Sequence, residues 1–402
     1  MFKLMIFAVL LIPVSAGAEV DTRAAEIEAA RTRKAQELQP DVLSPAERAL
    51  NFIKDKEIVE RLTAGIAGFR VKLGGLTTGS GFAFGPEYLR RDLRDGNLYI
   101  RASARTSLKA YQLYDIDFRL PHLAGDHVFV NFYAVHRNYP GINYYGQGPD
   151  SDKHGRSNYR LEDTSYRVTP GVKLFRHLSL GAGGEYLQVN VGPGTDRRFV
   201  SAERIYTPDT TPGIDRQTDF LRGAVFAQFD YRDNPGGPRR GGNYVAQFRY
   251  NKDHDAGNFS YRDVHLEVQQ YFPFFNERRV IALRAMTELT YQNPNQRVPF
   301  YLQPVVGGSD TVRGFRPFRF YGDNSLVLNG EYRWEAFSGL DMALFFDAGK
   351  VFQRKSQLNF HNLEASAGFG FRFNTRNNVF MRIDTGFSHE GFQLWLKFDN
   401  VF

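Results

Sequence analysis

Residues 326–337, LVLNGEYRWEAF, alternate between two kinds of side chain. One face of an extended chain would carry Leu326, Leu328, Gly330, Tyr332, Trp334 and Ala336, and the other Asn329, Glu331, Arg333 and Glu335. Because successive side chains of a strand point to opposite sides of its sheet, this period of two predicts a β-strand with one apolar and one polar face.

The same alternation continues on both sides of this stretch. It is clear in residues 340–352, LDMALFFDAGKVF, and in residues 363–373, LEASAGFGFRF. About sixteen such runs follow Gly65, centred near residues 73, 101, 114, 132, 168, 185, 226, 248, 266, 286, 302, 331, 346, 368, 384 and 397. Residues 74–85, GGLTTGSGFAFG, are interpreted as a first strand that is poor in large side chains.

The composition is aromatic without being strongly hydrophobic. The chain has 36 Phe, 21 Tyr and 38 Gly, but only 42% hydrophobic residues. A transmembrane β-barrel has this composition, because lipid-facing residues alternate with polar residues of the lumen and aromatic residues line both interfaces. We therefore predict an all-β fold: a transmembrane antiparallel β-barrel of about 16 strands over residues 65–402.

The amino-terminal residues predict export. Lys3 precedes an apolar run over residues 4–14, and residues 16–18, Ala-Gly-Ala, form an A-x-A cleavage site. We interpret residues 1–18 as a signal peptide and residues 19–64 as a short periplasmic helical segment, whose capping box begins at Ser44. An exported barrel is expected in the outer membrane of a Gram-negative cell, among outer-membrane lipid and lipopolysaccharide.

Residue counts, motifs and charge limit the classes of function that the sequence supports. The chain has no cysteine, so no disulfide framework is expected. Its nine histidines form no metal-ligand motif, and no nucleophile elbow is present. We expect no enzyme activity, with lipid hydrolysis as a remote alternative, and no cofactor or metal. The net charge of +7 is scattered and does not indicate a nucleic-acid partner, so none is expected.

Three motifs together resemble those of the superfamily of bacterial surface-antigen barrels, which assemble or translocate proteins at the outer membrane. Residues 312–315, VRGF, resemble the tip of its sixth extracellular loop, and residues 345–349, FFDAG, resemble its thirteenth strand. Residues 230–241 resemble its D-x-R-D-N-P turn through Asp230, Arg232, Asp233, Pro235 and Gly241. The turn also has a plain interpretation, since Asn-Pro-Gly-Gly-Pro is strong turn chemistry in any protein and its charges can be solvated at the periplasmic rim.

The resemblance implies that residues 307–318 fold back into the lumen. Period-two counting places Glu331 and Asp347 on the lumen face of adjacent strands, the twelfth and thirteenth. A guanidinium that loses solvent needs an acidic partner and can bridge two carboxylates. We predict that Arg313 binds Asp347 with Glu331 nearby, that Gly314 allows a tight turn or close backbone approach, and that Phe315 is an apolar plug. Gly349, the glycine of the FFDAG motif, is assigned to the same site. The alternative is a solvated arginine and two unrelated lumen acids.

The carboxyl end, residues 392–402, FQLWLKFDNVF, is predicted to be the last strand, with Phe398 and Phe402 on its apolar face. In outer-membrane barrels an aromatic carboxyl end is an assembly signal, although a strand can also simply end in Phe.

The leading hypothesis is a barrel of this superfamily that acts on proteins or lipids in the membrane, with a weakly paired seam between its first and last strands where client strands could pair. The glycines of residues 74–85 can also simply accommodate curvature. Members of the superfamily that handle other proteins carry polypeptide-transport-associated domains before the barrel, and we expect none here. The alternative hypothesis is a passive pore or structural scaffold that works with a separate periplasmic or lipoprotein partner.

Overall fold

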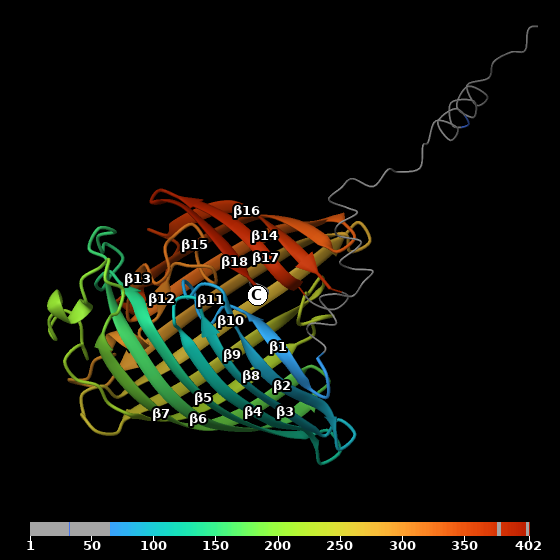
Figure 1. Ribbon diagram of the computed structural model, residues 1–402, viewed down its shortest axis with the longest axis horizontal. Helices are drawn as coiled ribbons and strands as arrows, with labels where there is room; N and C mark the ends of the chain where they lie inside the picture. The colour runs from blue at the N-terminus through green and yellow to red at the C-terminus, as the bar shows by residue number, and fades with distance from the viewer. Residues whose placement is uncertain (1–31, 33–64, 376–378, 399–401) are drawn as a thin grey trace, which may run out of the picture. The chain divides into compact units, whose positions relative to one another are not determined.

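The computed structural model describes residues 32, 65–375, 379–398 and 402. Within them, sixteen antiparallel strands form one continuous sheet that wraps into a barrel (Figure 1). The predicted signal peptide, residues 1–18, and all of the predicted helical segment except Thr32 lie outside the described residues. No helix in the described ranges is long and apolar enough to cross a membrane.

The barrel strands follow one another in chain order. They are β1 (Phe69–Gly74), β2 (Ala83–Leu93), β3 (Leu98–Ser107), β4 (Gln112–Leu123), β5 (Val128–Tyr144), β6 (Ser157–Phe175), β7 (Leu178–Pro193), β8 (Phe220–Asp230), β9 (Gly241–Asp253), β10 (Tyr261–Phe274), β11 (Arg279–Gln292), β14 (Asn324–Phe337), β15 (Leu340–Phe352), β16 (Glu364–Asn374), β17 (Val379–Ser388) and β18 (Gly391–Lys397). A separate two-stranded sheet is formed by β12 (Val305–Val306) and β13 (Phe320–Tyr321). Three short 3-10 helices are η1 (Ala202–Arg204), η2 (Phe300–Leu302) and η3 (Lys355–Gln357).

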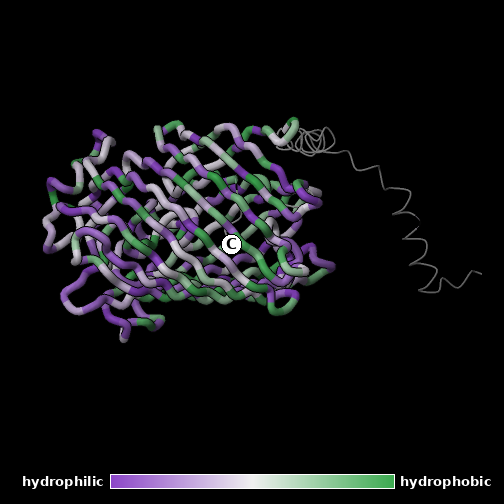
Figure 2. The backbone as a smooth tube through the Cα atoms, turned by 90° about the horizontal axis from the view of Figure 1, so that it is seen from below, coloured by the Kyte–Doolittle hydropathy of each residue, from purple (hydrophilic) through white to green (hydrophobic). Residues whose placement is uncertain are grey.

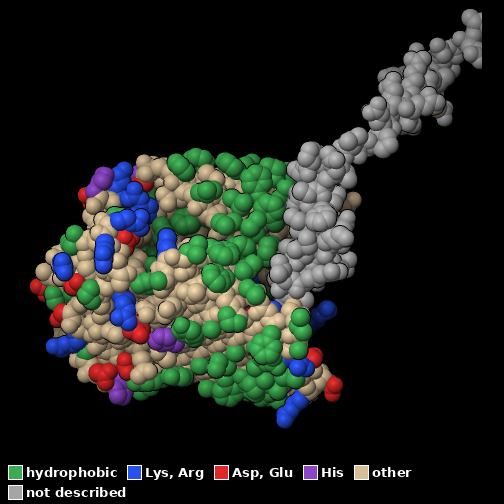
Figure 3. Space-filling view, in the orientation of Figure 1, with side chains coloured by type: hydrophobic (Ala, Val, Ile, Leu, Met, Phe, Trp, Pro, Cys, Tyr) green, Lys and Arg blue, Asp and Glu red, His purple; other side chains and the backbone are tan. Residues whose placement is uncertain are grey.

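The period of two in the sequence is the period of the barrel wall. In β15, Leu344 and Phe346 are 52% and 57% exposed on the outer face, whereas Phe345 and Asp347 between and beside them are buried on the inner face. Figure 2 shows the resulting alternation of hydrophobic and hydrophilic residues along the tilted strands. In Figure 3 hydrophobic side chains cover a broad area of the wall, while most charged side chains lie near its ends. This arrangement buries polar groups inside and presents apolar groups to lipid.

The two ends of the barrel differ. Strands at one end are joined by short turns such as residues 124–127 and 338–339, and at the other end by long loops over residues 145–156, 194–219 and 293–323. In outer-membrane barrels the short turns face the periplasm and the long loops face outward. The long loops cover a cluster of buried aromatic residues that includes Tyr144, Phe300 and Tyr321.

Two details of the predicted strand order are wrong: one predicted strand is absent and one strand was not predicted. The total number of barrel strands is therefore unchanged. The strand predicted near residue 302 is η2, whose Phe300 and Tyr301 are buried in the loop cluster rather than in the wall. The strand β2 was missed, because its polar run Arg90–Arg91–Asp92 hides the alternation. Residues 75–82 connect β1 to β2 instead of forming a first strand. Glu331 and Asp347 still lie on the twelfth and thirteenth barrel strands, β14 and β15.

The barrel is nearly closed. Among the described residues, β1 pairs with β2 alone and β18 pairs with β17 alone, so the first and last strands share no ladder. They nevertheless lie close together: a Cβ built on Gly74 would be 3.6 Å from the Cβ of Phe398. The rings of Phe82 and Phe398 are also in contact, with centroids 5.4 Å apart. We call this unpaired boundary between β1 and β18 the seam.

Candidate functional site

The loop over residues 307–318, here called the inner loop, packs against the inner face of the barrel. Its base is the β12–β13 pair. Val312 and Phe315 are fully buried with Val306 and Phe320, and this apolar group packs on Val327 and Val351 of the wall. The ring of Phe315 lies 5.4 Å from that of Phe320, centroid to centroid. The apolar contacts therefore fix the loop at the point where it carries Arg313.

Arg313 is fully buried and is held by Asp347 from two directions. Its Nε and Nη2 donate to Oδ2 and Oδ1 of Asp347, each at 2.7 Å, and its backbone N–H donates to Oδ2 at 3.1 Å. Asn329 orients the carboxylate by donating to Oδ1 at 2.8 Å. The geometry is the two-pronged contact that guanidinium and carboxylate form best. The remaining guanidinium nitrogen, Nη1, donates to Glu331.

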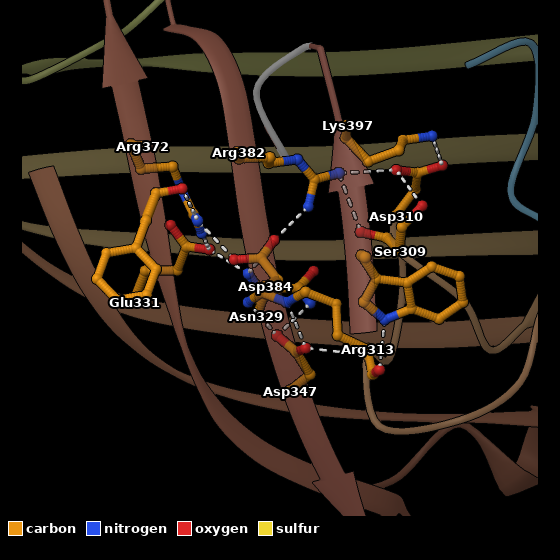
Figure 4. Close-up of polar contacts among 12 residues, drawn as sticks. Ser309, Asp310, Arg313, Asn329, Glu331, Asp347, Arg372, Arg382, Asp384 and Lys397 are labelled. Atoms are coloured by element: carbon orange, nitrogen blue, oxygen red, sulfur yellow. Dashed lines mark hydrogen bonds and ion pairs between the residues drawn. The ribbon is translucent and has the colours of Figure 1, made fainter. Parts of the chain in front are cut away.

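The charges around Arg313 continue as a network across four strands, drawn in Figure 4. Glu331 accepts hydrogen bonds from Arg333 at 2.6 Å and from Arg372 at 3.0 Å. Asp384 pairs with Arg372 and Arg382 and lies 3.7 Å from Arg313. Buried ions of this kind are costly to desolvate and are tolerated because each has hydrogen-bonded partners.

The electrostatics of Arg313 follow from this setting. Burial disfavours the charged form, but the carboxylates of Asp347 and Glu331 outweigh it and raise the pKa of Arg313 above its ordinary value. The guanidinium also lies over the ring of Phe345, 3.5 Å from its centroid, where the electron-rich face of the ring attracts it. Arg313 is therefore a permanent cation with both polar and aromatic partners.

Glycines bring the loop into direct backbone contact with the wall. A Cβ on Gly314 would lie 2.5 Å from that of Ser366, and a Cβ on Gly386 would lie 2.7 Å from the carbonyl group of Arg313. Gly349 similarly leaves room for Val312, whose Cγ2 would be 3.0 Å from an added Cβ. These positions need glycine because of close approach, and any side chain there would push the loop inward.

Hydrogen bonds tie the loop to the strands nearest the seam. The backbone N–H of Gly314 donates to Ser366 Oγ of β16 at 3.1 Å, and Ser388 Oγ of β17 donates to the carbonyl oxygen of Gly314 at 2.9 Å. The Nε1 of Trp395, in β18, donates to the carbonyl oxygen of Arg313 at 2.7 Å. The inner loop thus touches every strand from β14 to β18.

The site around the inner loop contains all the residues predicted for it and several others. The structure brings together Arg313, Gly314, Phe315, Glu331, Asp347 and Gly349. It adds Arg372, Arg382, Asp384, Gly386 and Trp395, which the sequence interpretation did not single out. The alternation in the sequence could have indicated them. Arg372, Arg382 and Asp384 occupy inner-face positions of strands that alternate between the two faces. Trp395 lies on the face opposite to the lipid-facing Leu394 and Leu396.

The turn over residues 231–240 lies at the short-turn end, far along the wall from the inner loop. Arg232 pairs with Asp230 at 2.8 Å, and the backbone N–H groups of Arg239 and Arg240 donate to Asp233 Oδ1. Gly241 has φ +91°, and an added Cβ would meet the carbonyl oxygen of Tyr231 at 2.3 Å. Pro235 lies within the same turn. Charged residues of the motif thus stabilise the turn from within.

One arginine of this turn makes a longer connection that the sequence did not suggest. Arg239 donates to both carboxylate oxygens of Asp341 in β15, at 2.9 and 2.7 Å, and to the carbonyl oxygen of Glu277 at 2.7 Å. These contacts join the β8–β9 turn to the β10–β11 turn and to β15, which is not a neighbour of β8 or β9 in the sheet.

The predicted position of Phe402 on the apolar outer face is wrong. Strand β18 ends at Lys397, and Phe402 lies outside any strand. Phe402 is buried against Tyr271, Val280 and Ala282 on the inner side, with its ring centroid 6.2 Å from that of Tyr271. Phe398 is half-buried beside Phe82 and Phe380 at the seam. Their role as an assembly signal is a separate matter and stays a prediction.

No cluster of three or more side chains that could hold a metal ion occurs in residues 65–375 and 379–398. The inner loop and its partners instead form a packed ionic network. An arrangement of this kind can hold a loop and the adjoining strands in one conformation.

Comparison with known proteins supports the barrel as a whole. A family profile described as the Omp85 superfamily domain matches residues 94–388. The fold is similar to that of BamA from Haemophilus ducreyi lacking POTRA domains 1-3, with a TM-score of 0.61 and 15% identity over 83% of this chain and 70% of that one. It is also similar to CdiB from Escherichia coli, with a TM-score of 0.57 and 12% identity over 83% of this chain and 62% of that one. No curated protein sequence matches.

Proposed function

The chain belongs to the Omp85 superfamily and is a nearly closed 16-stranded outer-membrane barrel, and we propose that it inserts or translocates client polypeptides at its seam. The observation that carries this proposal is the lack of a ladder between β1 and β18. Every other pair of neighbouring strands in the described part of the sheet shares a ladder. In lipid, unpaired backbone groups are costly, so an unpaired edge favours the addition of another strand.

The two edge strands are also the shortest of the barrel. The strand β1 has 6 residues and β18 has 7, whereas the barrel strands between them have 10 or more. Because β1 and β18 share no ladder, opening the seam breaks no ladder hydrogen bonds among the described residues, whereas separating any other neighbouring pair of barrel strands does. The edge of β18 would then offer its free backbone groups to a client strand.

The inner loop supports one side of this seam. Arg313 is anchored to β14 and β15, and its carbonyl oxygen accepts the hydrogen bond from Trp395 of β18. We propose that the loop keeps β18 in place while β1 separates from it. In this mechanism Arg313, Asp347 and Glu331 act as a lock, and Phe315 acts as the apolar plug beneath it.

A reversible cross-link across the seam tests this function. The chain has no cysteine, so a Gly74→Cys/Phe398→Cys pair would be its only thiols. The Cβ atoms at these positions lie 3.6 Å apart, within the usual range for a disulfide. The assay reconstitutes the barrel in liposomes and follows the folding of an unfolded eight-stranded barrel protein, read as heat-modifiable migration on a gel. Oxidation is expected to stop client folding and reduction to restore it.

The matched control places the cysteines in a continuous ladder. Ala227→Cys and Ala246→Cys lie directly opposite each other on β8 and β9, so a disulfide there joins two strands that are already paired. This pair should leave client folding unchanged. Equal activity of the oxidised and reduced seam pair would show that the seam does not have to open, and would contradict the proposal.

A passive pore or scaffold that works with a separate periplasmic partner is the competing function. It predicts a steady single-channel conductance with the inner loop in place. The packing of the loop favours a plugged lumen instead, since Val312, Arg313 and Phe315 have no exposed surface. Low conductance of the intact barrel, rising when residues 307–318 are removed, is therefore the expected result.

A further inference from the structure

A cavity of about 600 Å³ occupies the loop end of the seam. One wall is the edge strand β18 over residues 393–397, and the facing wall is the β1–β2 connection over residues 75–82. Its roof is formed by residues 195–198 and 316–318 of two long loops. The cavity therefore lies where the barrel wall is unpaired and where long loops mark the outward-facing end.

The lining of this cavity is strongly cationic. The cationic side chains are Lys109, Arg156, Arg198, Arg316 and Lys397, and the only carboxylate is Asp196. Two of the cations have acidic partners: Arg198 pairs with Asp196 at 2.7 Å, and Lys397 lies 3.5 Å from Asp310. The other three, Lys109, Arg156 and Arg316, form no ion pair with any residue that the structure describes. The cavity thus concentrates positive charge that the chain itself does not neutralise.

Arg156 is held in position by neutral residues and not by an acidic side chain. Its Nε and Nη2 donate to Asn143 Oδ1 at 3.1 and 2.9 Å, and its guanidinium lies 3.8 Å from the ring centroid of Phe199. Burial, together with the cations around them, lowers the pKa values of both Lys109 and Arg156. Each positive charge is therefore destabilised by its surroundings, which an anion in the cavity would relieve.

The same cavity has an apolar side that faces lipid. Leu394 and Leu396 line it, and their side chains belong to the outer face of β18, where they are 65% and 51% exposed. Hydrophobic side chains also cover a broad area of the barrel wall in Figure 3. A soluble anion would use only the cationic part of this site, whereas an acylated anion would use both parts.

We propose that the cavity binds an acylated lipid of the outer leaflet through its phosphate groups. Lys109, Arg156 and Arg316 would contact the phosphate, and the acyl chains would lie along Leu394 and Leu396. The site goes beyond the proposed handling of clients and does not depend on it, since it requires only the cavity, its charge and its lipid-facing edge. A bound lipid would fill the part of the seam where β18 has no partner strand.

Native mass spectrometry of the full chain in detergent tests the site with lipid A, an acylated glucosamine disaccharide with two phosphates. One bound lipid A is expected on the unaltered protein. The Lys109→Gln/Arg316→Gln variant should lower its affinity about tenfold or more, since two charge-assisted contacts are lost. The matched control is Arg197→Gln, an exposed arginine of the adjoining loop that does not line the cavity. It should bind lipid A as the unaltered protein does.

Two further arms use the unaltered protein and so do not depend on the folding of a variant. Lipid A stripped of its phosphates should bind about tenfold more weakly or worse, and inorganic phosphate at millimolar concentration should not displace intact lipid A. Equal binding of the dephosphorylated lipid, or equal binding by the double variant, would overturn the proposal. Complete displacement by inorganic phosphate would also overturn it, because the site would then recognise a free anion rather than a lipid.

Discussion

Both carboxylate oxygens of Asp347 lie 2.7 Å from guanidinium nitrogens of Arg313, although the two residues are separated by 34 positions in the chain. Neither side chain has any exposed surface. Removing either member leaves the other buried with fewer partners, which typically costs about 3–5 kcal/mol. Arg313→Ala and Asp347→Ala should therefore each lower the thermal stability and increase protease cleavage within residues 308–320.

The two changes are expected not to add, because the residues act as a unit, and the double variant should be little worse than either single one. Arg313→Lys should rescue only partly, since an ammonium group cannot make the two-pronged contact. The surface pair Arg198–Asp196 is the control, where the effects on thermal stability should be small and should simply add. Near-zero, additive effects at Arg313 and Asp347 would mean that the inner loop is free.

A second prediction concerns the close approach of Gly386 to the loop. An added Cβ would lie 2.7 Å from the carbonyl group of Arg313, closer than real Cβ contacts, and backbone atoms cannot rotate away. Gly386→Ala should therefore displace the loop and increase its protease sensitivity. Gly223→Ala is the control, because an added Cβ on that strand glycine meets no atom within 4 Å. Equal protease resistance of the two variants would show that the contact is not needed.

Much of the fold could be predicted from the sequence, because a wall between lipid and water imposes a period of two on every strand. The predicted strands were wrong where packing in a loop imitated the alternation of a strand, or where a polar run interrupted that alternation. Buried Phe300 and Tyr301 look like part of a strand but pack inside the loop cluster. The polar run Arg90–Arg91–Asp92 hides the end of β2, where Arg90 and Asp92 bond to each other.

The candidate site was less accessible to sequence reasoning. The faces of Glu331 and Asp347 could be counted along their strands, but their proximity to Arg313 was inferred from a resemblance. The part played by Asp384 and Trp395 depends on the path of the inner loop across β17 and β18, which no local pattern encodes. The predicted position of Phe402 was wrong because β18 ends at Lys397, so the period of two could not be extended to that residue.

A third prediction concerns location. A barrel with a lipid-facing apolar surface should fractionate with the outer membrane and resist unfolding in cold detergent. Heated and unheated samples are therefore expected to migrate differently on a gel. Recovery of the protein in the soluble periplasmic fraction would contradict both the outer-membrane location and the assignment of the exposed apolar side chains to lipid.

The last prediction separates two roles of the carboxyl-terminal Phe402. If the terminal aromatic residue is an assembly signal, Phe402→Ser should lower the yield of barrel in the outer membrane more than it lowers the stability of the barrels that do form. The structure offers a second role, since Phe402 packs on Tyr271 and its ring lies 5.3 Å from the guanidinium of Arg333. Tyr271→Ala removes this packing and leaves the carboxyl end intact.

The two variants should differ in yield if the signal is real. Phe402→Ser is expected to reduce outer-membrane yield severalfold, whereas Tyr271→Ala should mainly lower the unfolding temperature, because a buried aromatic side chain contributes about 1.5–3 kcal/mol. The measurements are the amount of heat-modifiable barrel in the outer membrane and its unfolding temperature after purification. Parallel losses in both variants would show that Phe402 acts through packing inside the barrel, and that the chain is not recognised by its last residue.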